Sequence, residues 1–248
     1  MFWNVVGAAV LFQRSIQKVR SMNLLYFYIN IGAFIIPFLF SFHPQIQFYK
    51  KWKFVFPAIF LTAIVFIAWD IYFTELKIWG FNPAYIFGIY FYQLPLEEVL
   101  FFVAIPYASL FTYYCFSVFI NKQVLKVYEK YITLFLLFFC SFIGLLFYNK
   151  LYTFSTFISL TILLASLKYI FNVNWLNRFY FTFLIILIPF TIVNGILTGT
   201  GINQPVVWYN DHENLGLRIL TIPVEDVFYG MFLLLLNTSF YEYFSRNK

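Results

Sequence analysis

The sequence has 248 residues, of which 62% are hydrophobic and only 10% are charged. Soluble domains carry about a quarter charged residues, so the composition excludes an ordinary soluble domain, a disordered chain and a basic-patch nucleic-acid binder. Phe, Tyr and Trp make up 25% of the chain, which is more apolar surface than one soluble core of this length can bury. Lipid is the solvent that accepts the remainder. The formal net charge of +6 comes from Lys and Arg in short connectors, where they act as topology signals.

A helix needs about 20 predominantly apolar residues to cross the hydrocarbon core of a membrane. The sequence predicts seven such helices, at 23–42, 54–72, 96–120, 131–148, 151–170, 179–196 and 219–240. We therefore expect an all-α integral membrane protein with about seven transmembrane helices. Residues 1–21 lack a small-residue cleavage site, and two interpretations of them stay open: a signal-like segment, or an N-terminal extension of a protein that starts at Met22.

Charge is divided unequally between the two ends of the predicted bundle. The cations at the end that holds the C-terminus are Lys50, Lys51, Lys53, Lys122, Lys126, Lys130, Lys168, Arg178, Arg246 and Lys248. The positive-inside rule then places the C-terminus in the cytoplasm, and we expect a multi-pass protein of a bacterial cell membrane. Eight of the ten acids lie at the opposite end, which indicates that this end uses carboxyl groups.

Two similar motifs indicate an internal repeat. The segment Pro95-Leu96-Glu97-Glu98 matches Pro223-Val224-Glu225-Asp226, 128 residues further on, and both run into a long apolar segment. We predict two parallel three-helix repeats, 22–120 and 151–248, joined by one extra helix in 121–150. The extra crossing gives both repeats the same orientation, so both motifs open on one side of the membrane.

The paired acids have two interpretations. One is a helix cap at the membrane interface, since the first helical turn favours Pro95 and Pro223 as structural residues and favours negative charge. The other is acid–base chemistry: Glu225 and Asp226 lie about 9 Å beyond Ile219, the predicted helix start, which is deeper than a cap requires. Desolvation and neighbouring like charges favour shared protons, so two acidic pairs at one apolar cavity could donate and accept protons near neutral pH.

Aromatic and polar neighbours of the acids suit a cationic intermediate. Aromatic faces stabilise cations, although an interfacial aromatic belt would explain most of these rings individually. The candidate residues for substrate binding and cation stabilisation are Phe101, Phe102, Tyr229, Trp79, Trp208 and Asn194. Asp70 is a candidate for orienting the glutamates by hydrogen bonding, with Asn194 in the matching place of the second repeat. We interpret His212, in a polar loop, as a solvated residue.

The two Pro-x-Glu-acid motifs, Trp69-Asp70 followed by Thr74, and the closing segment from Leu233 to Tyr243 resemble the integral-membrane lycopene cyclases of the heterodimeric type, with two subunits fused in one chain. The resemblance implies cyclisation of the linear ψ end groups of lycopene to β-ionone rings, giving γ-carotene and β-carotene. It implies an isomerase (intramolecular lyase) that works through a carbocation without net redox change. Glu97, Glu98, Glu225 and Asp226, with Asp70, are then the candidate catalytic residues.

The expected partners are the lipid membrane, an apolar carotenoid taken from the bilayer and other carotenoid-pathway enzymes. We expect no cofactor: Gly199-Thr200-Gly201 lies outside the strand–helix context of a dinucleotide fingerprint, which argues against a flavin, and the acids have no metal-diphosphate spacing.

A hydratase that captures the same cation with water stays open as an alternative, and a proton-coupled transporter is a second one. A seven-helix retinal protein is disfavoured, because the apolar segment 219–240 contains no lysine for a Schiff base.

Overall fold

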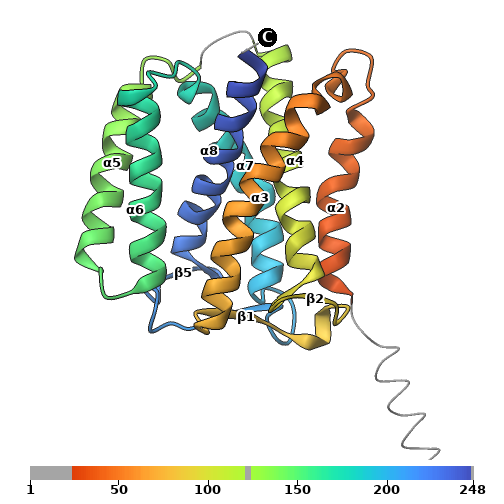
Figure 1. Ribbon diagram of the computed structural model, residues 1–248, viewed down its shortest axis with the longest axis vertical. Coiled ribbons are helices and arrows are strands. Elements are labelled where there is room, and N and C mark those ends of the chain that lie inside the picture. The colour runs from red at the N-terminus through yellow and green to blue at the C-terminus, as the bar shows by residue number, and fades with distance from the viewer. Residues whose placement is uncertain (1–23, 121–123, 247–248) are drawn as a thin grey trace, which may run out of the picture.

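The structure, a computed structural model, describes residues 24–120 and 124–246. In this part of the chain seven long α-helices stand side by side, and the short strands gather at one end of the bundle (Figure 1). The helices are α2 (Leu25–Phe40), α3 (Trp52–Glu75), α4 (Leu96–Phe119), α5 (Glu129–Leu146), α6 (Leu151–Ala165), α7 (Leu176–Thr198) and α8 (Val224–Arg246). The all-α membrane fold is confirmed, whereas the proposed extension at 1–21 lies outside the described residues.

Short elements complete the described part of the chain. They are the helical turns η1 (Phe48–Lys51), η2 (Pro83–Tyr85) and η3 (Ser166–Ile170), and the strands β1 (Trp79–Phe81), β2 (Tyr90–Phe91), β3 (Leu94–Pro95), β4 (Val207–Tyr209), β5 (Arg218–Ile219) and β6 (Ile222–Pro223). Each strand has one antiparallel partner: β1 pairs with β4, β2 with β3, and β5 with β6. The strands therefore link loops at the acidic end and leave the spans purely helical.

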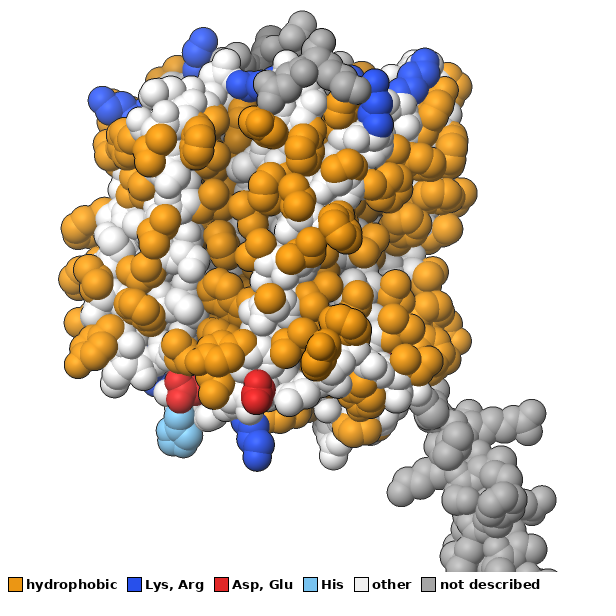
Figure 2. All heavy atoms as spheres, viewed as in Figure 1, with side chains coloured by type: hydrophobic (Ala, Val, Ile, Leu, Met, Phe, Trp, Pro, Cys, Tyr) orange, Lys and Arg blue, Asp and Glu red, His pale blue; other side chains and the backbone are white. Residues whose placement is uncertain are grey.

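The outer surface of the bundle is suited to lipid. Five helical segments are long and apolar enough to cross a membrane: α3 with η1, α4, α5, α6 with η3, and α7. Large apolar side chains point outward, for example Phe60 and Phe138, which are 65% and 70% exposed. Figure 2 shows a broad hydrophobic middle without charged side chains, with Lys and Arg at one end and acids, His and a few cations at the other. This is the pattern of a helical membrane protein.

The start of α8 differs from the prediction. We expected a helix from residue 219, but residues 218–223 form the β5–β6 hairpin, with Leu220 at its turn (φ 59°), and α8 begins at Val224. Hydropathy misses this boundary because the hairpin is itself apolar. Both acids therefore lie in the first helical turn, and the predicted depth of about 9 Å beyond the helix start is wrong. Pro223, like Pro95, lies directly before its helix rather than within the first turn.

The two halves of the chain make the same packing contacts. Helix α2 packs against α4 as α6 packs against α8, and α3 packs against α8 as α7 packs against α4. The hairpins match residue for residue: β2–β3 turns at Tyr92 (φ 55°), 128 residues before Leu220. Among the helices of residues 24–120 and 124–246, α5 has no counterpart, and it packs mainly on α6. The chain thus contains two parallel three-helix repeats with one additional helix between them.

A pseudo-two-fold axis passes through the β1–β4 pair. Gly80 lies opposite Trp208, its counterpart 128 residues later, and the flanking pairs Trp79–Tyr209 and Phe81–Val207 exchange under the same shift. Such a self-complementary pairing is the signature of a two-fold relation between equivalent segments. The axis brings the two acidic motifs, far apart in sequence, to a common centre.

Candidate functional site

One apolar cavity of about 530 Å³ lies between α2, α4, α7 and α8, and its polar end is at the acidic end of the bundle. Three carboxyl groups line it: Asp70 of α3, Glu98 of α4 and Asp226 of α8. All three are buried, with exposed fractions of 3%, 7% and 4%. At the sides the cavity is bounded by Ile36 of α2 and Ile192 of α7, each 61% exposed on the lipid-facing surface. The cavity therefore opens sideways, toward the hydrocarbon.

The cavity lies on only one side of the pseudo-two-fold axis. Small residues leave space there: a Cβ added at Gly32 of α2 would meet nothing within 4 Å, and Ala108 of α4 is a second lining residue. At the matching positions of the second half stand Ile158, which packs against Gly144 of α5, and Leu236. Larger side chains thus stand in the second half where the first half has small ones.

In the first half, two carboxyl groups contact each other. A hydrogen bond joins Asp70 and Glu98. The Tyr26 hydroxyl donates to Glu98 Oε2 at 2.5 Å, and the Tyr229 hydroxyl donates to Asp70 Oδ1 at 2.7 Å. A hydrogen bond between two carboxyl groups requires a proton on one of them, so this pair is arranged to share one proton inside the cavity.

In the second half, Asp226 is surrounded by three hydrogen-bond donors. The Tyr152 hydroxyl donates to Oδ1 at 2.5 Å, while the Tyr209 hydroxyl and the Asn194 amide each donate to Oδ2 at 2.9 Å. Burial and then the charge of Asp226 raise the pKa of Tyr209, which lies outside the spanning segments, well above its ordinary value. Tyr209 therefore remains a donor at every physiological pH, and three donors satisfy an ionised carboxylate.

The first acid of each motif faces a loop instead of the cavity. Glu97 Oε1 accepts the backbone N–H of Phe87 at 2.6 Å, and Glu225 Oε1 accepts that of Leu215 at 2.7 Å. Both donors lie ten residues upstream of their acceptors. Thr153 also donates to Glu225 at 2.7 Å. These two acids hold the loops that precede α4 and α8.

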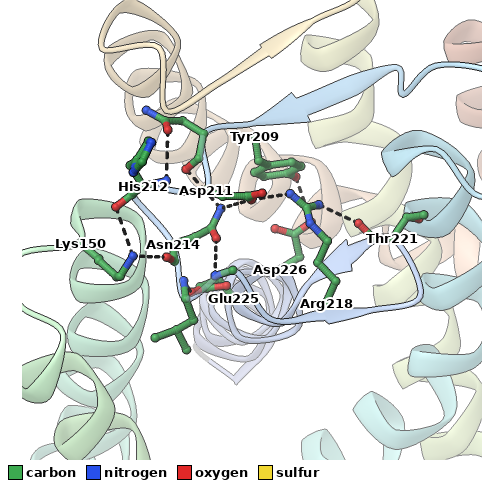
Figure 3. Close-up of polar contacts among 12 residues, drawn as sticks. Lys150, Tyr209, Asp211, His212, Asn214, Arg218, Thr221, Glu225 and Asp226 are labelled. Carbon is green, nitrogen blue, oxygen red and sulfur yellow. Dashed lines mark hydrogen bonds and ion pairs between the residues drawn. The ribbon is translucent and has the colours of Figure 1, made fainter.

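A polar network orders the loop of the second half (Figure 3). Arg218 donates to Asp211 Oδ1 at 2.6 Å and to the Thr221 carbonyl at 2.8 Å, and its guanidinium lies 5.9 Å from the centre of the Tyr209 ring. Asn214, nearly fully buried, accepts the N–H of Gly216 at 2.7 Å. This network fixes the backbone around Tyr209, whose hydroxyl reaches Asp226.

The predicted aromatic residues divide into two groups. Phe101, Trp79 and Tyr229 line the cavity, as does the predicted polar residue Asn194. Trp79 makes edge contacts with the rings of Tyr152, Tyr209 and Tyr229, at centroid distances of 5.1, 6.2 and 6.0 Å.

The other predicted residues lie elsewhere. Phe102 is fully buried in the core against Phe66, and Trp208 is 41% exposed above Gly80. His212 is exposed in its loop. The structure thus brings together only part of the predicted aromatic set.

We call Glu98 and Asp226, the second acid of each motif, the inner acids. Sequence reasoning missed the two tyrosines that donate hydrogen bonds to them. Tyr26 and Tyr152 lie near the first residues of α2 and α6, 126 residues apart, close to the repeat interval. Both follow a leucine, so a comparison of the two helix starts would have found them. Asp70 and Asn194 do occupy matching places, each beside the inner acid of its own half.

The fold and site together define a helical membrane protein with a buried acid cluster in a lipid-accessible cavity. A comparison with family profiles matches residues 23–116 and 149–244 to the family described as lycopene cyclase. The match covers most of the chain and falls on its two repeats, so the chain belongs to the lycopene cyclase family, whose members act on carotenoids. Comparisons with curated proteins and with solved structures found no match.

Proposed function

We propose that the protein is a lycopene β-cyclase, an isomerase that converts ψ end groups to β-ionone rings. The observation that carries this proposal is the group of three buried carboxyls, Asp70, Glu98 and Asp226, at the polar end of an apolar, aromatic cavity. Buried acids can protonate an alkene, and the surrounding rings stabilise the resulting cation and exclude water. A hydratase would instead need water at the same cation.

The reaction balances without a redox partner. A carboxylic acid of the cluster gives a proton to C2 of the C1=C2 bond, which leaves a cation at C1. The C5=C6 electrons then form the C1–C6 bond and move the cation to C5. Loss of the C6 proton to a carboxylate forms the C5=C6 bond of the β ring. The substrate and the product are therefore isomers.

The substrate enters from the bilayer in this proposal. Lycopene is insoluble in water, and the cavity is bounded by Ile36 and Ile192 at the lipid-facing surface between α2 and α7. Its volume of about 530 Å³ falls within the usual range for small-molecule sites and suits one end group with part of the polyene. The positive-inside pattern supports a C-terminus in the cytoplasm of a bacterial cell, and in that orientation the acid cluster lies near the opposite face.

Pigment analysis of lycopene-accumulating bacteria tests this function. Cells that express the protein should form γ-carotene or β-carotene, and cells that express a Glu98→Gln, Asp226→Asn double variant should retain lycopene. A Glu242→Gln variant, which alters a buried acid at the far end of α8, serves as the matched control and should behave as the parent. Hydroxylated products from the parent would assign a hydratase, and unchanged lycopene despite normal membrane insertion would reject the cyclase.

A further inference from the structure

We propose that the two halves divide the proton chemistry: the Asp70–Glu98 pair donates the proton, and Asp226 is the carboxylate that stabilises the cation and removes the C6 proton. This assignment rests on the proposed cyclase function. It goes further by giving opposite roles to the two inner acids, which occupy equivalent places in the repeat. Two pairs of equivalent positions that differ between the halves carry the argument.

The first difference lies beside the inner acid. In the first half this neighbour is Asp70, a second carboxyl group; in the second half it is Asn194, an amide. An aspartic acid beside Glu98 can share a proton with it. Asn194 can only donate its N–H to Asp226, so it supports the ionised form. The residue at this position therefore helps to supply a proton in the first half, whereas in the second half it stabilises the negative charge of Asp226.

The second difference lies one turn into the helix that carries each motif. Tyr229 of α8 donates to Asp70 at 2.7 Å, whereas its counterpart Phe101 of α4 has no hydroxyl to offer Asn194. The Asp70–Glu98 pair thus receives one tyrosine hydrogen bond on each acid, from Tyr229 and Tyr26. One shared proton and two donors leave the pair with a single negative charge and one proton to give.

Asp226 has the complementary arrangement. Its three donors, Tyr152, Tyr209 and Asn194, approach both oxygens. Because the hydrogen bonds of Asp226 come from two hydroxyls and an amide and from no described carboxyl group, the carboxylate is free to accept a proton during the reaction. Its negative charge lies in the same cavity as the donor pair, where it attracts a cation on the end group.

The proton cycle closes within the cavity. The pair transfers its proton to C2, the C1–C6 bond forms, and Asp226 takes the proton from C6 as the C5=C6 bond forms. Asp226 then carries the proton and the pair carries an additional negative charge. Return of the proton from Asp226 to the pair restores the starting state, and no external oxidant or reductant takes part.

The repeat supplies the substitutions for a test. Asp70→Asn copies the second half at this position, and Tyr229→Phe copies Phe101. Purified parent and variants would be assayed with lycopene in lipid vesicles, in H₂O and D₂O, with products identified by chromatography and mass spectrometry. Enzyme equilibrated in D₂O should place one deuterium at C2 of the first ring that it forms. In later turnovers the C6 proton returned through Asp226 dilutes this label unless the acid cluster exchanges with solvent.

We expect Asp70→Asn to lower turnover about 100-fold or more, the usual loss when a general acid is removed, and to leave lycopene unreacted. Tyr229→Phe should cause a smaller loss. Asp226→Asn should still consume lycopene, but the cation should lose a proton from C4 or the C5 methyl group, or capture water, so that ε, γ or hydroxylated end groups replace β rings.

Three results would overturn the division of roles. They are parent-like turnover in Asp70→Asn, intact lycopene as the sole outcome for Asp226→Asn, or altered rings from Asp70→Asn. Should Asp70→Asn fail to fold, Glu98→Gln removes the other member of the pair and carries the same expectation. Failure of the proposed function is distinct, since the parent itself would then form no ring and incorporate no deuterium.

Discussion

Gly80 and Trp208 face each other across the pseudo-two-fold axis, and the indole of Trp208 occupies the space where a side chain at position 80 would begin. A Cβ added to Gly80 would lie 2.4 Å from Cζ2 of Trp208. The two halves thus meet at a pair in which one member has no side chain and the other has the largest one. This contact joins the β1–β4 ladder beneath the cavity.

Gly80→Ala should destabilise the protein by about 1–3 kcal/mol, the usual cost of overpacking, because the Trp208 ring must move. Thermal unfolding in detergent, followed by circular dichroism, measures the effect. Gly32→Ala is the matched control: its Cβ would meet nothing within 4 Å and it lies within a helix, so it should not lower the melting temperature. Equal melting temperatures for both variants would contradict the proposed contact.

Glu97 should act through its hydrogen bond to the loop and not through its charge. Glu97→Gln keeps an acceptor for the Phe87 N–H, whereas Glu97→Leu leaves that donor unpaired at a cost of about 1–3 kcal/mol. The unfolding midpoint in denaturant should therefore fall for the leucine variant and stay near the parent value for the glutamine variant. The reverse order would show that the charge of Glu97 matters more than the loop contact.

A bulky residue at Gly32 should obstruct the cavity. Gly32→Trp places an indole where the structure has open space beside the lipid-facing opening, so the initial rate with lycopene should fall about tenfold or more. The control is Ile188→Trp, which adds the same group to an exposed position of α7 outside the cavity lining. Similar rates for the two variants would argue against substrate access between α2 and α7.

The loop that holds Tyr209 should loosen in acid. Burial is the largest single influence and raises the pKa of Asp211, but the hydrogen bonds from Asn214 and Arg218 and the charge of Arg218 together outweigh it and lower this pKa below its ordinary value of 3.8. A carboxyl with a lowered pKa stabilises the folded loop above that ordinary value, and the contribution is lost as pH falls through the lowered pKa.

A spin label at exposed Leu217, in a background without other cysteines, reports this change. Its mobility should be constant from pH 7 to about pH 4 and should rise below that range. The same label in an Asp211→Asn variant should show no such rise. A transition that persists in this variant would assign the change to another group.

The transmembrane spans could be predicted because long apolar runs have few alternatives in a membrane, and the motif repeat located the acids. Two features depended on backbone geometry that the sequence did not reveal. The β5–β6 hairpin is as apolar as a helix, so the start of α8 at Val224 was missed. Adjacent residues on a helix point about 100° apart, so the sequence could not tell that Glu98 faces the cavity while Glu97 faces a loop.

The position of the cavity to one side of the axis has a kinetic consequence for a substrate with two identical ends. In the proposed cyclase, each visit to this cavity closes one ring, and a second ring requires the molecule to withdraw into the bilayer and return reversed. The half-cyclised pigment is therefore a free membrane species between visits. Its share of the total pigment should depend on how many enzyme molecules serve each lycopene, so expression level alone can shift the pigment of a membrane from one-ringed to two-ringed.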